Sequence, residues 1–194
     1  MVAHINNTYS NFGITIIDNA SIDGSWDIIK EGYFIYPDTI DCDQEPINWG
    51  YGTGCNKGAA RRRDKADYFI FMNTDVFPPQ DKEGKMVDWI TPLVKTFETE
   101  EDVGVVAPKL LFPFDQTLRG HAVLGTNAEP KEDWYWMQPD GERYNTMLDG
   151  IYVTGACFMV PHDLFFQMGM LFPISSLNAE QLKVIEQVKL KGAS

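Results

Sequence analysis

The chain has 194 residues and a formal net charge of −12, with 44% hydrophobic and 13% aromatic residues. This length suits one globular domain. The negative charge argues against a nucleic-acid backbone or an anionic membrane as the main partner. It does not exclude a negatively charged small substrate, because a bound cation and local basic side chains can attract phosphates. The aromatic content indicates a well-filled core and aromatic surfaces for a ligand.

The three cysteines, Cys42, Cys55 and Cys157, are odd in number and show no metal-ligand spacing. This pattern favours free thiols in a reducing compartment. The sequence has no apolar signal core and no apolar run long enough to span a bilayer. We therefore expect a cytoplasmic protein without a transmembrane segment, located in the host cytoplasm if its source is viral.

The first strand is expected at Ile14–Ile17, which is rich in β-branched residues. A dense run of turn formers follows it at 18–25, and a helix is expected over about 26–31. One polar side chain of this loop is enough to cap that helix. Asp18, at the strand end itself, is not needed for the cap. The surplus of polar groups therefore favours a ligand site over a plain turn.

A short second strand is predicted at Phe34–Tyr36, followed by an irregular acidic loop over 38–50. The next segment, 49–60, begins with alternating glycines and becomes helical through about Lys65. A glycine-rich loop that opens a helix can bind phosphate through backbone N–H groups, although this spacing matches no P-loop or dinucleotide fingerprint. The basic residues here form either a solvated helix face or a surface that partly faces phosphate; they are Lys57, Arg61, Arg62, Arg63 and Lys65.

The central stretch is the apolar run Tyr68–Met72, which suits a strand buried on both faces. Asn73-Thr74-Asp75 follows, and Pro78-Pro79 then ends further sheet pairing. Ligands of open α/β sheets bind at the carboxyl ends of strands, and a carboxylate there can hold a divalent cation. Alternatively, the side chains of this polar step only form an Asx-turn.

The second half of the chain continues the alternation of strands and helices. A helix is expected at Met86–Phe97, a strand at 103–107, a last strand at 152–160 and a short helix from Pro161 to about Met168. Between the later strands, the long polar and aromatic stretch 115–148 is more typical of a functional insertion than of a connection. The alternation predicts an α/β fold with a mostly parallel central sheet and helices on both faces.

Five motifs, in the right order, resemble those of family 2 glycosyltransferases, in the style of the rhamnosyltransferase-like subgroup. Asp18-Asn19-Ala20-Ser21-Ile22-Asp23-Gly24-Ser25 resembles the Asp-rich step of that family. Gly50 to Gly58 resembles its N-x-G-x-x-x-x-N-x-G helix start, and Asp67 to Val76 looks like its variant of the DxD motif. The segments 103–110 and 153–160 resemble its later strands.

The resemblance implies a GT-A fold that binds a nucleotide-diphospho sugar, such as a UDP- or dTDP-sugar, through Mn2+ or Mg2+. The sugar would pass with inversion to a hydroxyl of a glycan or glycoprotein. Asp75 would be the main metal ligand, with Asn73 near the ribose or the water shell of the metal. Asp18 and Ser21 would line the nucleoside pocket. The full set of implied nucleotide-binding residues is Asp18, Asn19, Ser21, Asp23, Gly54, Asn56, Lys57, Asn73, Thr74 and Asp75.

The chain departs from the family pattern in two places. The family opens with an apolar strand before the Asp-rich loop, and residues 1–12 do not resemble it. The Glu-Asp pair that usually follows the last helix is replaced by Ala179-Glu180-Gln181. The candidate catalytic bases are therefore Glu180, Asp149 and Asp163, or the chain is the donor-binding part of a larger transferase. A sugar nucleotidyltransferase is a weaker alternative, since the Gly-rich, Lys/Arg-bearing loop of that class is missing.

Two histidines and an aromatic cluster leave alternatives open. His121 or His162 could complete the metal shell, or they could be surface and capping residues. The aromatic residues at 134–136 stack on a sugar or close over the sheet. We expect a GT-A-like domain over 1–175, with its nucleotide-binding part at about 14–80 and its acceptor-side part at about 100–175. A C-terminal amphipathic helix or tail is expected over 176–194.

Overall fold

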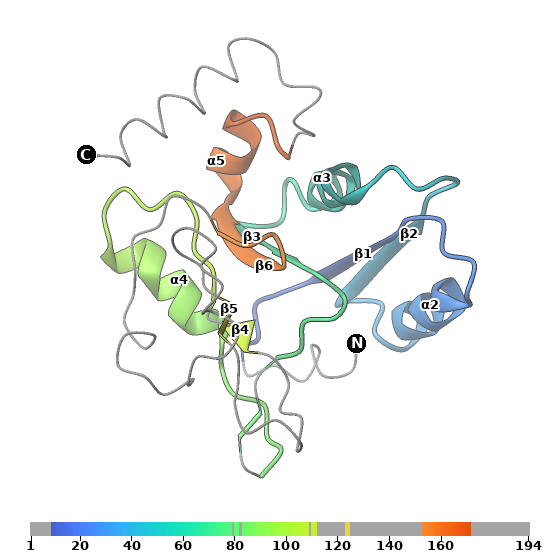
Figure 1. Cartoon of the computed structure of the whole chain (residues 1–194), viewed down its shortest axis with the longest axis horizontal. Coiled ribbons are helices and arrows are strands. Elements are labelled where there is room, and N and C mark those ends of the chain that lie inside the picture. The colour runs from blue at the N-terminus through green and yellow to red at the C-terminus, as the bar shows by residue number, and fades with distance from the viewer. Residues whose placement is uncertain are drawn as a thin grey trace.

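The computed structural model of the chain describes residues 9–78, 80–81, 83–108, 110–111, 123–124 and 153–171. Figure 1 shows α2 and α3 on opposite sides of the β1–β2 pair. No helix in these ranges is long and apolar enough to cross a membrane. In chain order the described elements are β1 (Ile14–Asp18), α2 (Ser25–Ile35), β2 (Ile40–Gln44), α3 (Tyr51–Arg61), β3 (Tyr68–Met72), α4 (Ile90–Thr99), β4 (Leu110–Leu111), β5 (Val123–Leu124), β6 (Cys157–Pro161) and α5 (His162–Gln167).

The first unit is β1–α2–β2, in which the helix connects two parallel strands. Ile14 lies opposite Ile40 and Asp18 lies opposite Gln44. The β-branched run predicted as the first strand is therefore confirmed as β1. α3 packs against β1, where the backbone of Gly58 lies close to the side chain of Ile17.

The prediction of the second strand at Phe34–Tyr36 is wrong. Phe34 and Ile35 belong to the last turn of α2, and their side chains are 84% and 56% exposed. The strand lies instead at Ile40–Gln44, inside the stretch that we expected to be an irregular acidic loop. The acidic residues of β2 are accommodated because Arg61 of α3 pairs with Asp41 and Asp43 at 2.6 and 3.1 Å. That pairing is non-local, so the sequence pattern does not reveal it.

The core lies around β3, which pairs antiparallel with β6. Tyr68 is opposite Pro161 and Met72 is opposite Cys157. The rings of Phe71 and Phe165 lie 4.9 Å apart between centroids. The buried cluster is formed by residues of α3, β3, β6 and α5, namely Ala59, Phe69, Phe71, Phe158, Val160 and Phe165. The central strand is thus confirmed, and the parallel pairing of the fold is found in β1–β2.

α4 begins later than its apolar pattern suggests. Met86 forms a bridge with Gln80, and the helix starts at Ile90 after Asp88 accepts a hydrogen bond from the Thr91 N–H at 3.0 Å. The strand expected at 103–107 is reduced to one bridge, between Val106 and Met159. This bridge still fixes the segment against the edge of β6.

Several predictions fall outside the described residues. They concern the histidine His121, the aromatic residues at 134–136, the candidate bases Asp149 and Glu180, and the C-terminal helix. The three cysteines, by contrast, are all described, and each is a free thiol. Burial raises the pKa of the Cys157 thiol to about 12.

Candidate functional site

At the carboxyl end of β1, Asp18 is a buried carboxylate that is fully engaged within the chain. Its side chain is only 4% exposed. Oδ1 accepts the Ser21 N–H at 3.3 Å, and Oδ2 accepts Nε2 of Gln44, at the end of β2, at 3.0 Å. Between them, Ala20 has a φ of 63°, the left-handed region that L-residues rarely adopt. Asp18 therefore closes a tight turn and joins the ends of two strands.

Asp23 holds the start of α2. Its Oδ1 accepts the Ser25 N–H at 3.1 Å and the Ser25 hydroxyl at 2.6 Å. These hydrogen bonds lower the pKa of the exposed Asp23 carboxyl. The N-cap residue of α2 is Gly24, which has no side-chain cap hydrogen bond, so the predicted cap by Ser25 or Asp23 is replaced by this contact with the first helical residue. Nucleotide binding by Asp23 and Ser21 stays a prediction.

Asn19 connects the β1 end to the start of α3. Its Nδ2 donates to the Gly50 carbonyl at 3.2 Å, and the Trp49 N–H donates to its Oδ1 at 3.4 Å. Gly54 lies directly beneath this amide, since a Cβ at position 54 would lie 3.1 Å from Asn19 Nδ2. The structure thus brings these two predicted site residues together. It also explains the glycine at position 54, because a side chain there would crowd the Asn19 amide.

An ion pair joins Glu45, which sequence reasoning did not select, to the predicted site residue Lys57 of α3, whose nucleotide-binding role stays a prediction. The side chain of Glu45 is buried and binds the Lys57 ammonium, and it also accepts the Trp49 indole N–H at 3.0 Å. The hydrogen bond from Lys57 lowers the pKa of the Glu45 carboxyl. The Lys57 ammonium also lies 5.3 Å from the centroid of the Trp49 ring. The sequence signal that could have identified Glu45 is its position directly after the alternating apolar and polar residues that form β2.

α3 is also tied to the C-terminal half of the described chain. Asn56 uses both ends of its amide on Leu171, and the Tyr51 hydroxyl donates to the Gly155 carbonyl at 2.6 Å. The predicted nucleotide-binding role of Asn56 stays a prediction, but its amide is already satisfied within the chain.

The polar step at the end of β3 is the most open part of the site. The Asn73 N–H donates to the Ala156 carbonyl at 2.8 Å, and its own carbonyl accepts the Val76 N–H at 3.2 Å. Thr74 and Asp75 are exposed. The Asp75 carboxylate has no hydrogen bond or ion pair with any residue in the described part of the chain.

These strand ends lie on one side of the fold, because a series of contacts joins them. Asn19 bonds to Gly50, the next residue Tyr51 bonds to Gly155, and the neighbouring Ala156 bonds to Asn73. A hollow of about 350 Å³ lies at the first turn of α3. We call it the α3 cavity; its lining residues are Trp49, Gly50, Tyr51, Gly52, Thr53, Gly155, Phe158 and Leu171.

Two of the sequence-predicted residues lie elsewhere, and this corrects their assignment. The His162 N–H donates to the Asp67 carbonyl at 2.9 Å, before β3 begins, whereas Asp75 follows the end of β3. Five strand residues span about 15 Å, whereas the ligands of one cation lie about 2–2.6 Å from it. His162 therefore cannot share a cation with Asp75, and Asp163 is too far away to act as a base there.

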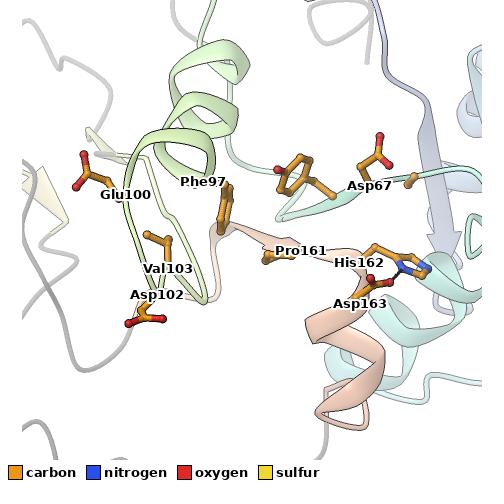
Figure 2. A pocket seen from close by; sticks show the side chains of 10 residues that line it. Asp67, Phe97, Glu100, Asp102, Val103, Pro161, His162 and Asp163 are labelled. Atoms are coloured by element: carbon orange, nitrogen blue, oxygen red, sulfur yellow. Dashed lines mark hydrogen bonds and ion pairs between the residues drawn. The ribbon is translucent and has the colours of Figure 1, made fainter.

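His162 and Asp163 instead line a separate pocket at the opposite end of β3. Figure 2 shows them on one side of this pocket and Phe97, with the acidic residues that follow α4, on the other; its volume is about 400 Å³. The His162 ring bonds through Nδ1 to Asp163 at 2.8 Å and packs on Phe166 at 4.9 Å between centroids. His162 is the first residue of α5, and both of these contacts are with neighbours in this helix.

The fold is that of an α/β protein, and the carboxyl ends of β1 and β3 are its candidate ligand site. The sequence profile of glycosyl transferase family 2 matches residues 2–166. The chain therefore belongs to this family.

Among solved structures, the chain is similar to the mannosyltransferase PcManGT from Pyrobaculum calidifontis, determined in complex with GDP-Man and Mn2+. The TM-score is 0.58 at 15% sequence identity, and the match covers 98% of this chain but 47% of the other. The chain thus spans about half of that protein. This likeness supports the GT-A type of fold. No curated protein sequence matches the chain.

Proposed function

We propose that the chain is a metal-dependent, inverting glycosyltransferase domain that moves a sugar from a nucleotide-diphospho sugar to a hydroxyl of a glycan or glycoprotein. The observation that carries this proposal is the exposed Asp75 carboxylate, directly after the central strand of a family 2 chain. A carboxylate that only shapes a turn accepts nearby backbone N–H groups, as Asp18 and Asp23 do. Asp75 has no such partner among the described residues, which favours a ligand role.

The residues present fit a cation that is held by few protein ligands. The described part of the chain contains no group of three or more His, Cys, Asp or Glu side chains that could hold a metal alone. In nucleotide enzymes, however, Mg2+ binds through one or two carboxylates together with substrate phosphates. We therefore assign the cation to Asp75 and the donor diphosphate, with Asn73 beside its water shell.

The reaction needs charge stabilisation on one side of the sugar and a base on the other. When bound, the cation neutralises the charge that develops on the leaving nucleoside diphosphate. A carboxylate takes the proton of the acceptor hydroxyl as its oxygen attacks the anomeric carbon from the opposite side, so the configuration inverts. Because Asp163 lies at the far end of β3, Glu180 and Asp149 remain the proposed bases.

Ligand-induced stabilisation tests this proposal directly. We expect Mn2+ together with UDP or dTDP to raise the melting temperature, since a ligand at about 100 times its Kd stabilises the folded state by about 2.7 kcal/mol. GDP belongs in the same series because of the solved mannosyltransferase. Asp75→Ala should abolish the shift and EDTA should reduce it, whereas Asp64→Ala, an exposed carboxylate outside the site, should keep it. If no nucleotide stabilises the wild-type chain, the proposal fails.

A second candidate is a donor-binding part of a larger transferase. It is favoured by the coverage of the solved mannosyltransferase, 47% of its length, and by the distance of Asp163 from the donor side. Nucleotide binding without sugar transfer and without donor hydrolysis would support this second candidate. Transfer to an added glycan acceptor would support the first.

A further inference from the structure

Asn56 holds the backbone of Leu171 with an unusually complete contact. Its Nδ2 donates to the Leu171 carbonyl at 2.7 Å, and the Leu171 N–H donates to its Oδ1 at 2.8 Å. Both atoms of the amide therefore bind one residue that is 115 positions away in sequence. Two such bonds fix both the position and the orientation of the backbone of this residue, as they do between paired strands.

The residues directly before Leu171 are also fixed by hydrogen bonds. The Gly169 N–H donates to the Phe166 carbonyl at 3.1 Å and the Met170 N–H to the Phe165 carbonyl at 2.9 Å, which is a Schellman motif at the end of α5. Gly169 and Met170 have φ values of 84° and 70°. A left-handed conformation at a non-glycine residue persists only where its surroundings determine it. The backbone is therefore constrained at Leu171 and over the residues that lead into it.

Leu171 in turn forms part of the wall of the α3 cavity. A Cβ placed on Gly52 would lie 3.7 Å from the Leu171 Cβ, so the two residues are in close contact. Across the cavity, the Tyr51 hydroxyl holds Gly155. Trp49 and Tyr51, which line the cavity, combine apolar ring faces with a polar tip, and such rings suit a sugar.

We propose that Asn56 is a positioning residue, which holds Leu171 in place so that the α3 cavity fits the sugar substrate and excludes water. This inference rests on the proposed function. By holding Leu171 in place, Asn56 controls what fraction of the donor sugar is transferred to the acceptor and what fraction is hydrolysed. In hydrolysis, a water oxygen replaces the acceptor oxygen at the anomeric carbon, the bond from that carbon to the diphosphate oxygen breaks, and a water proton is released to solvent. If Leu171 is not held in place, water can enter the α3 cavity and reach the anomeric carbon.

The test compares Asn56→Ala and Leu171→Ala with the wild type and with Asn11→Ala, an exposed control. For each protein, Mn2+-dependent nucleotide affinity, sugar transfer and donor hydrolysis are measured on the same sample, with the donor whose nucleotide stabilises the wild type. We expect the ratio of hydrolysis to transfer to rise about tenfold in both cavity variants, and nucleotide affinity to stay within twofold of the wild type in Leu171→Ala. The control should match the wild type.

The ratio separates positioning from folding, because a merely less stable protein loses transfer and hydrolysis in parallel. An unchanged ratio in both variants, or a parallel loss of nucleotide affinity in Leu171→Ala, overturns the inference while wild-type transfer upholds the proposed function. If Asn56→Ala does not fold, Leu171→Ala, which keeps the backbone contact, decides the question. A wild-type chain that neither transfers nor hydrolyses any donor overturns both.

Discussion

Replacement of Asp18 separates its structural contribution from nucleotide binding. The carboxylate is 4% exposed and accepts hydrogen bonds from the Ser21 N–H and from Gln44 Nε2. Asp18→Ala removes both acceptors and leaves the Ser21 N–H without this partner. Asp18→Asn keeps the shape, and Gln44 can turn its amide to present an oxygen to the new NH2 group. Both hydrogen bonds can then remain, but the residue at position 18 no longer carries a charge.

The magnitudes follow from the two contacts. Hydrogen bonds to a charged group contribute about 1.5–3 kcal/mol each, and neutral bonds about 0.5–1.5 kcal/mol. We expect a loss of unfolding free energy of about 2–4 kcal/mol for Asp18→Ala and about 1 kcal/mol for Asp18→Asn. For a chain of this size, 1 kcal/mol corresponds to about 2–4 °C in Tm. The expected falls in Tm are therefore roughly 4–16 °C and roughly 2–4 °C.

Thermal unfolding with and without Mn2+ and nucleotide measures both effects. If Asp18 also binds the nucleoside, Asp18→Asn should lose most of the nucleotide-induced shift while remaining close to the wild type in stability. Asp38→Asn, an exposed carboxylate, serves as the control and should change neither value. A Tm for Asp18→Ala within 1 °C of the wild type, on the order of the measurement error, would refute the structural reasoning.

Two further predictions concern contacts of α3. A helical Gly→Ala change normally stabilises by about 1 kcal/mol, and Gly58→Ala should do so because its Cβ would make ordinary contacts at 3.6 Å or more. Gly54→Ala should not, since its Cβ would displace Asn19, so urea unfolding should rank Gly58→Ala above Gly54→Ala. Arg61 lowers the pKa of Asp41 from its usual 3.8, and this pair should contribute about 0.5–1 kcal/mol. The Tm difference between wild type and Arg61→Gln should be fully present above about pH 4–5 and should vanish as the pH falls through the lowered pKa of Asp41. A difference that grows in acid would contradict this prediction.

Local sequence patterns identified the elements whose side chains act within a few residues. The β-branched run at Ile14–Ile17 and the aromatic run at Tyr68–Met72 are strands, because such side chains favour extended backbone and burial in a sheet. The fold class and the family followed from the order of these elements and of the motifs between them. Asp18 and Asn73 were correctly placed at strand ends because those ends are visible as a change from apolar to polar residues.

The same local reasoning failed where a partner lies far away in the chain. The apolar residues Phe34 and Ile35 resemble a strand but end a helix, while β2 carries acidic side chains that only Arg61 can explain. A propensity rule contains no information about a cation that approaches from another element. The strand was therefore assigned to the wrong segment.

What the sequence determined by itself is the set of polar groups at the carboxyl ends of the strands, because strand ends and turn residues are local features. What only the tertiary structure decided is which of the predicted site residues are free of partners within the described part of the chain. Asn56 is occupied by a backbone 115 positions away, His162 lies at the opposite end of β3, and Asp75 has no partner among the described residues. Hydrogen-bond satisfaction depends on distances in space, and those distances are set by packing rather than by position in the chain.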